Sequence, residues 1–398
     1  MMTAMSRPQD STAARWHGAA QLVGLVRAEP GITRATAAQR LGISSGGATD
    51  LVARLRAHEL LDEVPAPSRG RGRPTTVLQP HARGPLVIAA DLRPKDWSLA
   101  LADIGGQPKF VTPTPLDSPD PAQLVAEVAS AIRDAYDREP GRVRAVSVSV
   151  AGTVSDDRLV QFTPRGWSDV DLSPLTAALP RHLDIPLLIG NDATLAGLAE
   201  ARTGAAHGAG TALHLMIGVG LGGALVVDGV PATGAHGAAG EYGHIPFGDP
   251  SQVCPCGAQG CWDLTIDGRA LARHIGEKAP VDPIAYARGI AGGNNLSDNR
   301  IRGAFDAVAT SIGRGIAGLV NLHDPDVVTL GGLAPTLRAA ASDSFDAAYR
   351  QGLMAFRKNA APPVLDGLHG DDGPLHGAVA IGLDHVTSEQ SLAEWARQ

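Results

Sequence analysis

The residues with the clearest capacity for chemistry are three cysteines that lie within a span of eight positions. They are Cys254, Cys256 and Cys261, the chain contains no others, and His244 precedes them by ten residues. Thiolate and imidazole groups in a set of four suit tetrahedral zinc, and four protein ligands leave no open position for a substrate. The spacing therefore predicts a structural zinc site. The alternative is three free thiols near an unrelated histidine, which accounts less well for such close clustering.

The segment around this loop alternates between expected strands and expected helices. Apolar runs bounded by glycine turns predict the strands, and helical spacing of apolar residues predicts the helices. The strands are expected at residues 86–91, 97–103, 143–150, 187–189, 213–217 and 225–227, and the helices at 124–138 and 193–202. This alternation is typical of the α/β class with mixed sheets.

A different unit precedes this body, and its pattern predicts a helix-turn-helix. Helical spacing is expected over 21–27, 34–41 and about 45–58, with Thr33 as a plausible cap and Gly42 in the tight turn. Two short helices joined by a glycine turn are typical of DNA-binding domains, in which the second helix enters the major groove. A three-helix module that binds protein is the alternative.

The segment after these helices predicts a wing. Strands are expected at 60–64 and 75–78, joined by an arginine-glycine tip at 68–74 that resembles an AT-hook core. Arginines suit a narrow, negatively charged minor groove. A solvated linker is the alternative. The candidate DNA contacts in the helix and the wing are Ser44, Ser45, Thr49, Arg54, Arg69, Arg71 and Arg73.

Length and charge agree with this division. A chain of 398 residues predicts two or three domains, and 44% hydrophobic residues exclude disorder throughout. Residues 1–83 carry 11 arginines and 6 acids, a charge of +5, so the rest of the −7 chain carries −12. A basic head on an acidic body suggests that only the head binds a polyanion. A chance distribution of surface charges is the alternative explanation of this asymmetry. No apolar run is long enough for a membrane span and no secretory signal is visible, so we expect a cytoplasmic protein without a membrane partner.

Five short motifs in the chain resemble those of the ROK family of repressors, open reading frames and sugar kinases. They are IGNDA at 189–193, GVGLGG at 218–223, GEYGH at 240–244, CPCGAQGC at 254–261 and, more weakly, VVTLGG at 327–332. The similarity extends from about residue 21 to residue 383.

This resemblance implies an N-terminal winged helix-turn-helix followed by an α/β two-lobed actin-like ATPase and sugar-kinase fold. The expected division is a disordered segment at 1–14, a DNA-binding domain at 15–83, an N-terminal lobe at 84–192 and a C-terminal lobe at 193–398. The last lobe would carry the zinc loop, and its last helix would pack back on the N-terminal lobe.

The resemblance also assigns a sugar pocket. It implies that Asn191, Asp192, Glu241 and His244 contact a sugar, and that His244, Cys254, Cys256 and Cys261 bind zinc. In the kinases the aspartate at 192 is the general base that accepts the proton of a sugar hydroxyl; here it could also cap the helix that follows. Asp263 stands where the family usually has glutamate, and Arg165 is a further candidate contact.

The nucleotide half of the site departs from the family. The kinases have an Asp-x-Gly-Gly-Thr turn after the first strand, whereas this chain has Asp91-Leu-Arg-Pro-Lys-Asp96, in which Pro94 lacks a backbone donor. Valine replaces the usual threonine between Gly218 and Gly220. Asp91 could still hold Mg²⁺, and the adenosine-side glycines Gly331 and Gly332 remain. We expect most ATP phosphate binding to be lost, so Mg-ATP is not an expected cofactor.

Three hypotheses follow. The first is a transcriptional regulator of carbohydrate metabolism, most simply a repressor, that binds a palindromic operator as a homodimer or homotetramer and responds to a sugar or phosphosugar. The second is an ATP-dependent sugar kinase that uses Asp192 as its base. The third is a regulator that senses a protein partner.

Overall fold

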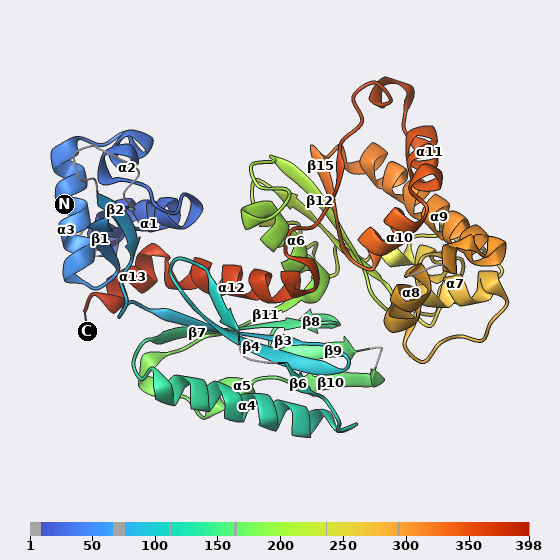
Figure 1. The fold of residues 1–398 in the computed structure, drawn as a ribbon. Helices are drawn as coiled ribbons and strands as arrows, with labels where there is room; N and C mark the ends of the chain where they lie inside the picture. The colour runs from blue at the N-terminus through green and yellow to red at the C-terminus, as the bar shows by residue number, and fades with distance from the viewer. Residues whose placement is uncertain are drawn as a thin grey trace, which may run out of the picture.

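The head of the chain is a three-helix unit followed by a two-stranded hairpin. A computed structural model describes residues 9–66, 76–110, 113–162, 165–235, 237–292 and 295–397. Its first elements are α1 (Gln9–Ala28), α2 (Arg34–Leu41), α3 (Ser45–Ala57) and the antiparallel strands β1 (Leu61–Pro65) and β2 (Thr76–Pro80) (Figure 1). The expected order of a helical head and an α/β body is confirmed.

Local capping explains where the head helices begin. The side chain of Thr33 accepts the N–H of Thr36, and that of Ser44 accepts the N–H of Gly47. Gly42 has a φ of 64°, which glycine adopts without strain and which turns the chain between α2 and α3. Helix α1 differs from expectation, because it begins at Gln9, inside the segment expected to be disordered. Its core residue Trp16 is only 5% exposed, and this burial supports a helix longer than residues 21–27.

The N-terminal sheet of the body has the strand order β11-β7-β3-β4-β5. Strand β7 pairs in parallel with both β11 and β3, whereas β4 pairs antiparallel with both β3 and β5. Helix α4 (Pro121–Arg138) and helix α12 (Gly373–Val386) lie on opposite faces (Figure 1). Successive residues of β3 point to opposite faces, so Ile88 packs in the core with α4 and Val87 in the core with α12. The strands are β3 (Leu86–Leu92), β4 (Asp96–Asp103), β5 (Pro108–Phe110), β6 (Thr114–Pro115), β7 (Val143–Val150) and β11 (Leu187–Asn191).

A smaller sheet and short helices complete this lobe. The sheet has the order β10-β9-β8. Its strands are β8 (Thr153–Ser155), β9 (Arg158–Phe162) and β10 (Trp167–Asp171), and α5 (Pro174–Ala177) and η2 (Arg181–Leu183) follow.

The C-terminal sheet has the order β14-β13-β12-β15-β16. Its strands are β12 (Thr211–Ile217), β13 (Leu221–Val227), β14 (Val230–Pro231), β15 (Val327–Gly332) and β16 (Val364–Asp366). One large core joins this sheet to the long helix α9, with Phe305, Ile312 and Trp262 fully buried. The helices are α6 (Asp192–Thr203), α7 (Gly268–Ile275), α8 (Pro283–Ala291), α9 (Asn299–His323), α10 (Ala334–Ala340) and α11 (Ser342–Gly352).

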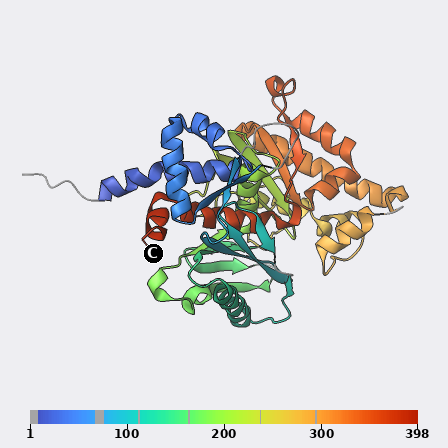
Figure 2. The same ribbon diagram turned by 60° about the vertical axis from the view of Figure 1, so that its left-hand side comes forward.

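The last two helices join the three units. Helix α12 packs on α6 and on the N-terminal sheet, and α13 (Glu389–Trp395) packs on α1 of the head (Figures 1 and 2). Contact between α6 and α12 is close, since a Cβ atom at Gly377 would collide with the carbonyl oxygen of Leu195. No helix in the described part of the chain has the length and apolar character needed to cross a bilayer.

Candidate effector and metal site

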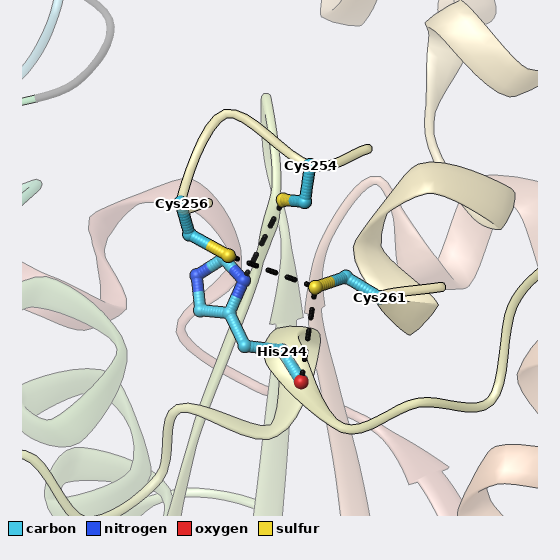
Figure 3. Close-up of side chains that lie close together, drawn as sticks. All are labelled: His244, Cys254, Cys256 and Cys261. Carbon is cyan, nitrogen blue, oxygen red and sulfur yellow. Dashed lines mark hydrogen bonds between the residues drawn. The ribbon is translucent and has the colours of Figure 1, made fainter. Parts of the chain in front are cut away.

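The loop after β14 brings one histidine and three cysteines to a single point (Figure 3). The donor atoms of His244, Cys254, Cys256 and Cys261 all lie within 4.8 Å of one another. Sγ of Cys256 is 3.7 Å from Sγ of Cys261, and Sγ of Cys254 is 3.8 Å from Nδ1 of His244. Sulfur ligands of a tetrahedral zinc ion, bound at about 2.3 Å, are about 3.8 Å apart. The set could therefore hold a metal ion, and its geometry fits zinc.

Burial disfavours the thiolate form of two of these cysteines, whereas a hydrogen bond from the backbone of Ala258 lowers the pKa of Cys256. Burial raises the pKa of the Cys261 thiol to about 12 and also raises that of Cys254. Metal binding requires thiolates, so the charge of the ion must offset this desolvation. The loop is closed independently of a metal by main-chain bonds, including the N–H of Cys254 to the carbonyl of Ala258.

The histidine links the metal cluster to the next group of polar residues. Nδ1 of His244 faces Cys254, and its Nε2 lies 3.8 Å from a carboxylate oxygen of Glu241. A metal on Nδ1 would fix the ring and leave Nε2 for a ligand.

The junction between β11 and α6 positions a second pair of polar residues. Asn191 is the cap of α6, since its Oδ1 accepts the N–H of Thr194 at 3.1 Å, while its Nδ2 donates to the carbonyl of Gly152 and to Asp192. The cap is thus Asn191, and Asp192 is the first helical residue. Burial raises the pKa of Asp192 to about 7, and the carboxylates of Asp91 and Glu241 add to this shift.

A pocket opens beside these two groups. Asn191 and Glu241 both line it, whereas Asp192 and His244 do not. Two of the four residues expected at a sugar site thus line the pocket; Asp192 accepts a hydrogen bond from Asn191, and Nε2 of His244 lies 3.8 Å from Glu241. Other lining residues were not predicted from the sequence, namely Thr153 and Val154 after β7 and Thr194 in the first turn of α6. The carboxyl ends of the parallel strands β7 and β11 meet at one sheet edge, and this topology could have indicated the strand-end residues.

Two expected contacts have other partners. The guanidinium of Arg165 donates to the carbonyls of Pro94, Leu116 and Ser118, so we assign it a structural role in place of a sugar contact. Asp263 is 8% exposed and lies behind the 218–220 turn, where a Cβ atom at Gly220 would be 2.9 Å from its Oδ1. Its other oxygen is 3.6 Å from Arg269, and it does not line the pocket.

The turn after β3 is filled by charged side chains. Nε of Arg93 is 3.7 Å from buried Asp91 and donates to Asp96 at 2.6 Å. Lys95 pairs with Asp282 at the start of α8, which joins the two lobes at this edge. Burial raises the pKa of Asp91 to about 6. These contacts occupy the turn in which the kinases have bare glycine backbone.

The surviving glycines have a structural explanation in this chain. Gly332 has a φ of 63°, and a Cβ atom there would collide with the carbonyl oxygen of Ile217. A Cβ atom at Gly331 would lie 3.1 Å from the ring of buried His214, and the N–H of Gly218 donates to the carbonyl of Gly220. Their presence therefore does not require a nucleotide.

The head presents part of its expected DNA surface. Ser44, Ser45 and Thr49 are exposed at the start of α3. Arg54 differs, because it is half-buried with its guanidinium 5.6 Å from the centre of the Trp16 ring. Arg69, Arg71 and Arg73 lie outside the described residues.

Comparison with known proteins gives one family. Residues 106–385 match the model of the ROK family. A glucokinase of Streptomyces coelicolor is 28% identical over 294 residues, covering 69% of this chain and 89% of the relative. The xylose repressor of Bacillus subtilis is 22% identical, covering 75% and 77%.

Solved structures share the fold. A ROK family transcriptional regulator, described as a homologue of the Escherichia coli Mlc protein, superposes with a TM-score of 0.76 over 96% of this chain and 99% of its own, at 20% identity. A ROK glucokinase from Streptomyces griseus in complex with glucose and AMPPNP has a TM-score of 0.60, covers 74% and 98%, and is 24% identical. The regulator therefore matches the head as well as the body.

Proposed function

Because the chain belongs to the ROK family, we propose that it is a DNA-binding transcriptional regulator, most simply a repressor, whose body binds a sugar or phosphosugar. The observation that carries the proposal is the turn after β3, where Arg93, Pro94 and Lys95 stand at the expected phosphate site while the sugar-side residues remain. The helical head, matched along its length by a regulator structure, supports it.

In this proposal the sugar is held by the four residues at the start of α6 and in the metal loop. Asp192 and Glu241 accept hydrogen bonds from sugar hydroxyls, Asn191 both donates and accepts, and Nε2 of His244 contacts a further hydroxyl. A structural zinc ion on His244, Cys254, Cys256 and Cys261 would keep the histidine ring in place. The proposed domains are 15–83, which helix α1 extends back to Gln9, 84–192 and 193–398.

The DNA-binding part of the proposal assigns α3 to the major groove of a palindromic operator. Helix-turn-helix dimers read half-sites about one turn apart, so a homodimer or homotetramer is proposed. Ser44, Ser45 and Thr49 are the proposed contacts with the bases, and the arginines of 68–74 are proposed to bind the minor groove.

Thr49→Glu is expected to weaken operator binding at least about tenfold, because a carboxylate on this exposed surface repels the phosphates. Sugar affinity, measured by calorimetry, should stay unchanged. The matched control is Ala122→Glu, which adds the same charge to an exposed position of α4. If fluorescence anisotropy gave equal operator affinity for Thr49→Glu and wild type, α3 would not be part of the DNA interface.

The kinase alternative is tested with nucleotide. We expect no AMPPNP binding at millimolar concentration and no sugar-dependent ADP release, because charged side chains fill the phosphate turn and Pro94 removes a donor. A coupled assay with D-glucose, D-xylose and N-acetyl-D-glucosamine measures this. ADP release that requires sugar and disappears in Asp192→Asn would instead establish a kinase.

A further inference from the structure

Helix α6 connects the proposed sugar pocket to the outer surface near the head. Asn191 and Asp192 stand at its start, and Arg202 lies in its last turn. A helix of 12 residues is about 18 Å long. If α6 moves as a rigid body, a displacement of its first residues also displaces its last turn. Nη1 of Arg202 donates to Oδ1 of Asp384 at 2.5 Å.

Asp384 on α12 has a second cationic partner, and it belongs to the head. Nη2 of Arg27, in the last turn of α1, lies 3.5 Å from the same Oδ1 atom. Burial lowers the pKa of Arg27, the charge of Asp384 opposes this, and the guanidinium of Arg202 lowers it further. Two guanidinium groups that repel each other thus share one carboxylate.

The surroundings hold this carboxylate where both units meet. The Arg27 side chain would lie 3.4 Å from a Cβ atom at Gly106, in the turn after β4, and Leu383 packs at the same position. Helix α13, directly after α12, is fixed to the head by Trp395, whose Nε1 donates to the carbonyl of His58, and by Glu389, which lies 2.7 Å from His17. Figure 1 shows α12 extending from α6 to α13 and the head.

We propose that Asp384 is the ionic junction through which sugar binding at the start of α6 changes the position of the DNA-binding head. The inference rests on the proposed function. Arg202 lies closer to the carboxylate of Asp384 than Arg27 does. Movement of α6 would change the distance between Arg202 and Asp384, and so the strength of the attraction between Asp384 and Arg27. Asp384 is a positioning residue, because it touches neither the sugar pocket nor α3.

The test compares operator affinity with and without sugar in wild type, Asp384→Asn and Arg27→Gln. The probes are D-glucose and D-xylose with the operator fragment defined by footprinting. Wild type should show a coupling ratio of about 5 to 150, the usual range for allosteric proteins. Both variants should reduce this ratio at least about fivefold while sugar affinity stays within about twofold of wild type. The double variant should match Asp384→Asn, because that substitution already removes the ion pair that Arg27→Gln removes.

The control is Asp137→Asn, which removes an exposed ion pair with Arg133 on α4 and should leave the ratio unchanged. Unchanged ratios in Asp384→Asn and Arg27→Gln would overturn the inference and leave the proposed function standing. Loss of sugar affinity in Asp384→Asn would also overturn it, since the residue would then support the pocket. A wild-type protein that binds the operator without any response to sugar would overturn the proposed function, and the inference with it.

Discussion

Replacing Cys261 with alanine is expected to release the metal ion and to weaken sugar binding at least about a hundredfold. A structural zinc ion contributes roughly 10–16 kcal/mol in small zinc-binding peptides, and loss of one of four ligands forfeits much of this. Without the ion, His244 and its neighbour Glu241 lose the constraint that orients them towards the pocket. Metal content by mass spectrometry and sugar affinity by calorimetry measure the two effects.

The matched control for this variant is Val253→Ala, an exposed position in the same loop that offers no ligand atom. It should retain one zinc ion per chain and full sugar affinity. If Cys261→Ala kept both metal and affinity, the four-residue site would be wrong. If it lost the metal but bound sugar normally, the link between the metal and His244 would be wrong.

Asp192→Asn is expected to weaken sugar binding about 10- to 150-fold at pH 8. The carboxylate, with a pKa of about 7, is charged at this pH, and a hydrogen bond to a charged group contributes about 1.5–3 kcal/mol. The asparagine has nearly the same shape, so its carbonyl oxygen still accepts the N–H of Ala193. Asp157→Asn, on an exposed turn, is the control and should bind as wild type does.

The same substitution should change how stability depends on pH. The pKa of Asp192 in the folded protein, about 7, lies above the ordinary 3.8, so the folded state binds this proton more tightly than the unfolded chain. Its stabilising contribution is complete below about pH 4 and is lost as the pH rises through 7, with a slope of at most about 1.4 kcal/mol per pH unit. Urea denaturation between pH 5 and pH 7 should therefore show a shallower decline in Asp192→Asn. Equal slopes would show that the pKa of Asp192 is not raised in the folded protein.

The sequence predicted that His244 and the three cysteines lie together, because close spacing in the chain limits where these side chains can lie. Three cysteines within eight residues can hardly avoid one another, and Asn191 and Asp192 follow a strand directly. The head helices were predicted for a similar reason, since Thr33, Gly42 and Ser44 are local signals.

Side-chain direction could not be predicted in the same way. Arg165 reaches three carbonyls, two of which lie 47 and 49 residues away, and Arg54 turns inward over Trp16. Asp263 is buried behind a turn that only the tertiary fold places there. The Lys95–Asp282 and Arg202–Asp384 pairs each join residues more than 180 positions apart, so no local sequence pattern predicts them.

The most direct test of the account is a footprint of the full chain on the DNA upstream of its own gene and neighbouring genes, repeated with D-glucose, D-xylose and their phosphates. We expect a protected palindrome whose occupancy changes with one of these sugars, and Thr49→Glu should need at least about tenfold more protein for the same protection. Absence of protection on every fragment, with or without sugar, would contradict it.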